Sequence, residues 1–186
     1  MTQLLIVIAS TRPGRVGLPV GRWVERRARE HGACDVAVAD LAELELPMMD
    51  EPNHPRLARY EHEHTKAWSR TVAAADAVVF VMPEYNYGYT APLKNAIDYL
   101  HNEWRRKPAG CVSYGGVSGG LRAAQALVPV LLAIGMLSAG AVPIPFVAQS
   151  VQGDELEPTP PVEQGLTAML DELVTLEAAS RSLRAA

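Results

Sequence analysis

Short apolar runs alternate along the chain with stretches in which apolar residues recur every three or four positions. The runs have the length of strands that are buried on both faces of a sheet: residues 4–9, 34–39, 77–82, 109–114 and 141–147. The stretches with three- to four-residue spacing predict helices, whose apolar faces fall within residues 20–28, 68–75, 93–104, 121–132 and 162–173. Strand and helix therefore follow one another in regular order.

Prolines modify two of these elements. Pro143 and Pro145 cannot donate a hydrogen bond to a neighbouring strand, so the fifth strand is expected at the edge of the sheet. Pro129 lies within the predicted helix over 121–132, where an interior proline costs about 3 kcal/mol. We expect a kink there, or the start of a second helical segment.

The regular alternation predicts an α/β fold, a doubly wound sheet of five parallel strands. Because 48% of the 186 residues are hydrophobic, we expect a single domain over residues 1–186 with one sizeable core. The flavodoxin-like strand order 2-1-3-4-5 places a crevice between the first and third strands. Three loops with unusual sequences then meet at one edge of the sheet: residues 10–17, 83–91 and 115–120.

The charge and the termini of the chain limit its partners and its location. A formal net charge of −4 argues against nucleic acid and anionic membranes, which require clustered basic residues. The arginines within residues 22–29 are expected on the exposed face of a helix. No run reaches the ~20 apolar residues that span a bilayer, and the first residues lack the basic start of a secretory signal. We therefore expect a cytoplasmic protein in which Cys34 and Cys111 stay reduced.

The first loop carries groups that suit a phosphate. Ser10 offers a hydroxyl, and Arg12 and Arg15 offer guanidinium groups. Val16 and Gly17 bring backbone N–H groups to the start of a helix, where the helix dipole attracts anions. A solvated turn is the simpler alternative for the same residues.

The second and third loops together predict a slot for a planar ring system. The second offers an aromatic wall beside backbone donors, and the third has small residues that allow a flat ligand to approach the backbone. Packing or a subunit contact is the alternative for the tyrosines, and a carboxylate at a loop edge is usually solvated rather than a general acid. The residues expected at this slot are Pro83, Glu84, Tyr85, Asn86, Tyr87 and Gly88 in the second loop, and Ser113, Gly115, Gly116 and Ser118 at the third.

At these residues the chain resembles the NADPH-dependent FMN reductases, flavodoxin-like enzymes that include quinone, azo-dye and chromate reductases. The resemblance covers roughly the first two thirds of the chain. Its most specific part is Pro83-Glu84-Tyr85-Asn86 with Gly88, Pro92, Leu93-Lys94-Asn95 and Asp98. Ser10 and Arg12 correspond to the family's phosphate loop. One departure is that Val16-Gly17-Leu18-Pro19 stands where many members have an additional Ser or Asn.

The resemblance implies bound FMN, NADPH or NADH as reductant, and a small acceptor such as a quinone, an azo compound, a metal oxyanion or flavin. No catalytic side chain is then required, because the flavin N5 accepts hydride, and ping-pong kinetics are expected. The resemblance also implies a homodimer or homotetramer, with Trp104 and the tyrosines before it near the interface. Burial of the apolar stripe from Leu93 to Trp104 against the chain's own sheet is the simpler alternative. A non-enzymatic FMN-binding electron-transfer protein is the alternative, and a nucleotide-binding or hydrolytic enzyme on the same fold is a third hypothesis.

Two further features of the sequence are weaker candidates for a binding site. His62 and His64 would face different directions on a helix, so we expect no metal site. Arg105, Arg106 and Arg122 are candidate contacts to the 2′-phosphate of NADPH, although an ordinary surface charge is the simpler interpretation of each.

Overall fold

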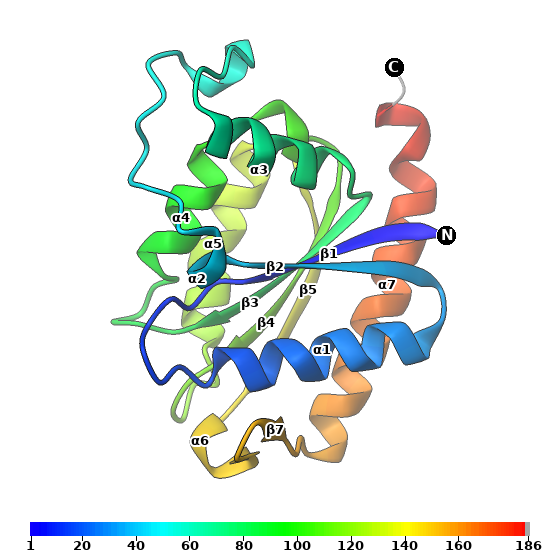
Figure 1. The fold of residues 1–186 in the computed structure, drawn as a ribbon. Coiled ribbons are helices and arrows are strands. Elements are labelled where there is room, and N and C mark those ends of the chain that lie inside the picture. Colours follow the sequence, from blue (N-terminus) through cyan, green and yellow to red (C-terminus); the bar gives the residue numbers. More distant parts are fainter. Residues whose placement is uncertain (185–186) are drawn as a thin grey trace.

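A parallel sheet of five strands forms the centre of the computed structural model, which describes residues 1–184 (Figure 1). The strand order is β2-β1-β3-β4-β5, as the sequence predicted, and β5 lies at one edge. The strand bounds are β1 Thr2–Ile8, β2 Cys34–Asp40, β3 Ala77–Pro83, β4 Pro108–Tyr114 and β5 Leu137–Ile144. The fifth strand begins and ends earlier than the predicted residues 141–147.

Helices cover both faces of the sheet (Figure 1). One face packs against α1 (Gly17–His31) and α7 (Pro160–Arg184), and the other against α3 (Glu63–Ala73), α4 (Ala91–Asp98) and α5 (Leu121–Ala133). The connections contain the shorter elements α2 (Leu41–Leu44), η1 (Pro55–Leu57), η2 (Asn102–Trp104), α6 (Val147–Ser150), β6 (Val151–Gln152) and β7 (Glu155–Leu156).

Successive side chains of the central strands enter opposite cores, because a strand points alternate residues to opposite faces. Ile6 and Val79 are fully buried under α1 and α7, whereas Val7 and Phe80 are fully buried under the helices of the other face. Both faces therefore require apolar residues, which explains why the strands read as continuous apolar runs.

The predicted helix over residues 93–104 is shorter than expected. Helix α4 ends at Asp98, and Trp104 follows in the separate 3₁₀ turn η2. Trp104 has no exposed surface, packs against Trp68 and Phe80, and donates its indole N–H to the carbonyl of Ile97. Trp104 is therefore buried against the chain's own sheet, the simpler of the two alternatives, and its ring has no surface with which to contact a second subunit.

The second helical segment that Pro129 could have started does not form, since α5 runs without interruption from Leu121 to Ala133. Proline leaves the carbonyl of the residue four positions earlier, Gln125, without its helical partner. Pro129 and Gln125 both lie on the exposed side of the helix, where water can bind that carbonyl. The helix therefore tolerates the proline at this position.

Both cysteines are buried and free of disulfides. Burial raises the pKa of Cys111 to about 12, and it raises the pKa of Cys34 as well, so both thiols remain protonated. Within residues 1–184, none of the helices combines the length and the apolar character that a bilayer crossing requires.

Candidate functional site

The three predicted loops meet at the carboxyl ends of β1, β3 and β4. Between them lies a cavity of about 150 Å³. It is lined by Ser10, Arg12, Arg15 and Val16 of the first loop, Pro83, Glu84 and Tyr85 at the second, and Tyr114, Gly115 and Val147 around the third. The structure thus brings together eight of the predicted site residues and adds Tyr114 and Val147.

Helix α1 presents unpaired backbone donors to this cavity. Val16 precedes the helix without a side-chain cap, and the N–H groups of Val16, Gly17 and Leu18 have no hydrogen-bond partner among residues 1–184. These groups carry the positive end of the helix dipole, and no acidic residue stands in the first turn. The helix start is therefore a place where an anion would be stabilised.

The two arginines of the first loop differ in whether their side chains have hydrogen-bond partners. Arg15 forms a two-pronged ion pair with Asp40 and donates to the carbonyl of Ser10. Arg12 is exposed and has no side-chain partner within residues 1–184. Arg15 therefore fixes the shape of the loop, while Arg12 is free to bind a ligand.

Tyr114 lines the cavity, and its hydroxyl is buried beside Ser10 and Gly17. The residue is 3% exposed, and its hydroxyl has no hydrogen-bond partner in the described chain. Burial raises the pKa of this hydroxyl, so it remains a donor. A Cβ on Gly17 would lie 2.4 Å from the Tyr114 oxygen and 3.2 Å from the Ser10 Cβ, so only glycine leaves room here.

The second loop turns tightly around Asn86 and Tyr87. Tyr85 and Gly88 exchange two backbone hydrogen bonds of 2.9 Å. Asn86 and Tyr87 both have positive φ, 49° and 69°, which is the backbone of a type I′ turn. Tyrosine occupies a position that favours glycine, at a cost of roughly 1–2 kcal/mol. The turn projects the Tyr87 ring outward, 67% exposed, while the hydroxyl of Tyr85 lies 3.4 Å from that of Ser10.

Glu84 is not solvated, contrary to the prediction. Its side chain is only 10% exposed and accepts hydrogen bonds from the Ser118 hydroxyl, the Arg122 backbone N–H and the Arg122 guanidinium. Burial disfavours the charged form of Glu84, but these hydrogen bonds outweigh it and lower the pKa of the carboxyl. The Arg122 guanidinium also lies 4.2 Å from the centre of the Tyr87 ring. Glu84 and Arg122 therefore join the second loop to the start of α5.

The third loop folds back on β4 and β5. The buried Ser113 hydroxyl donates to the carbonyl of Gly119, so it shapes the loop from the side opposite the cavity. Gly120 has a φ of 81°, and a Cβ there would lie 2.6 Å from the Tyr114 nitrogen. Around Gly116 a Cβ would meet no atom within 4 Å, which leaves open space beside the loop. Of the predicted third-loop residues, Gly115 alone lines the cavity.

The sequence analysis missed Tyr114 and Val147 as site residues, and it named Arg122 only as a candidate contact to NADPH. Ser113 and Tyr114 are neighbours on a strand, so one side chain of the pair faces the cavity and the other faces α5. The strand pattern did not reveal which, because both faces of β4 are buried.

Two secondary predictions have different outcomes from those expected. His62 precedes α3 in extended backbone, so its ring stacks on that of His64 at 5.2 Å instead of facing another direction. Within residues 1–184 no three His, Cys, Asp or Glu side chains are grouped in a way that would hold a metal ion.

Arg105 and Arg106 lie before β4, at the opposite end of the strands from the three loops, so they cannot contact a nicotinamide cofactor there.

A family model described as NADPH-dependent FMN reductase matches residues 2–149. The chain belongs to this family. An NAD(P)H-dependent FMN reductase of Schizosaccharomyces pombe is 42% identical over 125 residues, which cover 66% of this chain and 62% of that protein. An NAD(P)H-dependent FMN reductase of Saccharomyces cerevisiae is 37% identical over 150 residues, covering 75% of this chain and 78% of that protein. The match to the first of these relatives thus spans less than two thirds of its length.

The fold of this FMN reductase family member also recurs among solved structures. The flavoenzyme NAD(P)H:(acceptor) oxidoreductase from Paracoccus denitrificans has a TM-score of 0.76 at 22% identity, with 97% of this chain and 99% of that chain covered. A flavodoxin from Megasphaera elsdenii has a TM-score of 0.58 at 12% identity, covering 92% of this chain and 98% of that one. At these identities the likeness concerns the fold.

The residues around the cavity fit the phosphate end of FMN. The orphaned Tyr114 hydroxyl, the unpaired N–H groups before and within the first turn of α1, and the exposed Arg12 are all donors, and a phosphate supplies only acceptors. Gly17 lets the Tyr114 oxygen pack directly against the start of α1, because a Cβ there would lie 2.4 Å from that oxygen. Which residues bind FMN remains a prediction.

Proposed function

We propose that this protein is an NAD(P)H-dependent FMN reductase, which transfers electrons from a nicotinamide to a small acceptor. The observation that carries the proposal is the set of unpartnered donors in one cavity at the crest of the sheet, beside a loop that carries the family's signature. The proposed acceptor class comprises quinones, azo compounds, metal oxyanions and free flavin.

The proposed cofactor contacts divide between the two ends of FMN. The start of α1, Ser10, Arg12 and Tyr114 would hold the phosphate, and the turn at residues 85–88 with Gly115 and Gly116 would hold the ring system. When bound, FMN supplies the redox chemistry through a ring that accepts hydride at N5. The chain itself supplies position: Glu84 and Arg122 hold the turn rigid, and Tyr87 and Arg122 border the space above it.

A single open slot supports alternating use by reductant and acceptor, which gives ping-pong kinetics. Three exposed apolar side chains belong to the second and third loops or adjoin them: Tyr87, Val117 and Phe146, with exposed fractions of 67%, 72% and 49%. The Phe146 N–H donates to the carbonyl of Gly116. An apolar rim of this kind suits a nicotinamide ring, a quinone or the surface of a second subunit. We propose a cytoplasmic homodimer or homotetramer whose interface includes this rim, with Trp104 in the core of each subunit.

The decisive experiment is a visible spectrum of the purified protein with added FMN, before and after anaerobic addition of NADPH. A reductase should bind FMN and lose the flavin absorption band near 450 nm, roughly its usual position, when NADPH is added. An electron carrier would bind FMN and stay yellow with NADPH. A protein with no affinity for FMN would refute both, and it would favour a different reaction on the same fold.

A further inference from the structure

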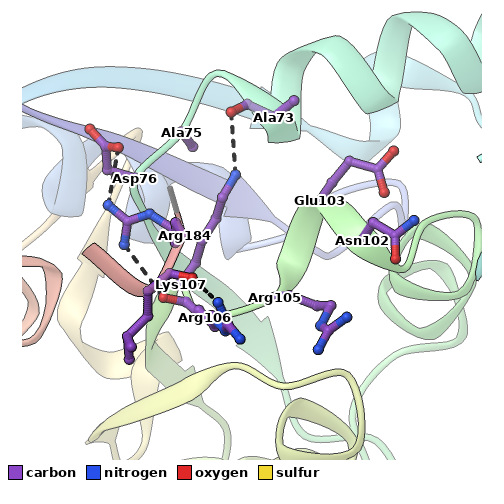
Figure 2. Close-up of a pocket in the computed structure, with 10 residues that line it drawn as sticks. Ala73, Ala75, Asp76, Asn102, Glu103, Arg105, Arg106, Lys107 and Arg184 are labelled. Atoms are coloured by element: carbon purple, nitrogen blue, oxygen red, sulfur yellow. Dashed lines mark hydrogen bonds and ion pairs between the residues drawn. The ribbon is translucent and has the colours of Figure 1, made fainter. Parts of the chain in front are cut away.

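A second, larger cavity lies at the opposite edge of the sheet, where β3 and β4 begin. It has a volume of about 550 Å³, within the usual range of small-molecule sites. Figure 2 shows Asp76, Arg184 and Lys107 on one side of it and Glu103, Asn102 and Arg105 on the other. The remaining lining residues are Ala73, Ala75, Arg106 and Leu183.

Three consecutive basic residues line this cavity without a carboxylate partner. The side chain of Arg105 makes no hydrogen bond within residues 1–184, and that of Arg106 donates only to the carbonyl of Leu183. Lys107 donates to the carbonyls of Val72 and Ala73 at the end of α3. None of the three forms an ion pair within the described chain.

The two carboxylates at the cavity are already engaged elsewhere. Asp76 accepts from the backbone N–H of Gln3 and from Arg184. Glu103 accepts from the hydroxyls of Tyr60 and Ser69. The cavity therefore retains more donor capacity than its own acceptors satisfy.

The backbone at Arg106, in the middle of these three basic residues, is strained. Arg106 has a φ of 62°, a left-handed conformation that non-glycine residues rarely adopt. This turn lets three neighbouring residues line one cavity. Strain of this kind persists where the surroundings enforce it and is frequent at binding sites.

Lys107 is the buried member of the group. The residue is 6% exposed, and burial lowers the pKa of its ammonium group to about 8; Arg184 lowers it further, while Asp76 and Glu103 oppose the shift. A buried cation with too little compensating negative charge is stabilised by a bound anion.

We infer that the cavity lined by Arg105, Arg106 and Lys107 binds a small organic anion that carries phosphoryl groups. Guanidinium groups match phosphate oxygens in geometry and charge. The volume exceeds that of a lone phosphate, and Ala73, Ala75 and Leu183 provide an apolar wall for the rest of the molecule. The inference does not depend on the proposed redox function, because the two sites share no residue.

Calorimetric titration with inorganic pyrophosphate tests this site. Arg105→Gln and Arg106→Gly should each weaken binding about five- to tenfold. Arg59→Gln removes the same charge from an exposed residue outside the cavity, and Arg12→Gln removes it at the flavin loops. Arg59→Gln should bind pyrophosphate within about twofold of the parent protein, whereas Arg12→Gln should change only the binding of pyrophosphate at the three loops.

The fold of the variants is checked by thermal unfolding. Arg106→Gly should raise the melting temperature, since glycine relieves the left-handed strain, even as it weakens binding. The inference is overturned if millimolar pyrophosphate does not bind, if all variants bind equally, or if Arg12→Gln is the variant that loses affinity. The last result would assign the binding to the flavin loops.

A second measurement uses sulfate, whose charge is constant between pH 7 and 9. Sulfate should bind more tightly at pH 7 than at pH 9, because Lys107 is protonated at the lower pH and faces Asp76, Glu103, Arg184 and the α3 carbonyls at both. Lys107→Met should remove this pH dependence. An unchanged dependence in that variant would count against the site.

Discussion

Replacing Tyr114 with phenylalanine should stabilise the cofactor-free protein and weaken FMN binding. The Tyr114 hydroxyl is buried without a partner, and an unsatisfied buried polar group costs about 1–3 kcal/mol. Removing it should therefore raise the free energy of unfolding by about that amount, measured by urea denaturation without FMN. With FMN present, the lost hydrogen bond to a charged group is worth about 1.5–3 kcal/mol. The dissociation constant, measured by quenching of flavin fluorescence, should rise roughly 10- to 150-fold.

Tyr99→Phe is the matched control for this experiment. Tyr99 is also fully buried, but its hydroxyl donates to the Pro47 carbonyl at 3.0 Å and to Asp50 Oδ1 at 2.9 Å. Its loss should destabilise the protein by about 1–2 kcal/mol and leave FMN affinity unchanged. If Tyr114→Phe also destabilises the cofactor-free protein, the hydroxyl has a partner in that state. If it leaves FMN affinity intact, Tyr114 does not contact the phosphate.

Three further changes test other parts of the molecule. Glu84→Gln should lower stability by about 1–2 kcal/mol in urea unfolding at neutral pH, because Arg122 and Ser118 lose a charged acceptor. The pKa of Glu84 lies below its ordinary value of 4.5, so its contribution to stability is complete above that pH and is lost as the pH falls. The two proteins should therefore become equally stable in acid, and a constant difference would contradict this. Gly17→Ala should weaken FMN binding without loss of fold by circular dichroism, since the new methyl group displaces Tyr114, and unchanged affinity would show that the cavity is not used. The unfolding free energy of Lys107→Met should fall relative to that of the parent protein as the pH rises from 8 to 10.5, by at most about 3 kcal/mol. The reason is that the lysine of the parent protein has a pKa of about 8 when folded and an ordinary value of 10.5; a pH-independent difference would argue against the shift.

The sheet and the place of the site were predictable because their signals are local. A buried parallel strand must be apolar on both faces, and the loops that follow β1, β3 and β4 must share an edge once the order is known. The fate of Trp104 was not predictable in this way. Its spacing from Leu100 continues a helical pattern, but the chain leaves the helix after Asp98, and a 3₁₀ turn returns the ring to the core.

Contacts between distant residues account for the other errors. Glu84 reads as an exposed loop residue until Ser118 and Arg122 are brought beside it, 34 and 38 positions later in the chain. The role of Tyr114 depends on which face of β4 its side chain occupies. Because β4 is buried on both faces, its sequence does not alternate between apolar and polar residues and does not indicate that face. The left-handed backbone at Tyr87 and Arg106 is likewise set by the surrounding fold, because neither residue type favours it.

The loops that follow β3 and β4 and the cavity lined by Arg105, Arg106 and Lys107 occupy opposite ends of the same two strands. β3 and β4 each contain seven residues, so the two places are separated by about 20 Å of extended chain. Perturbations that far apart, with no shared partner, combine additively to within about 0.5 kcal/mol. The change in unfolding free energy of the double variant Tyr114→Phe with Arg105→Gln should therefore equal the sum of the changes in the two single variants. Evolution or engineering can accordingly alter one end of the sheet without changing the other.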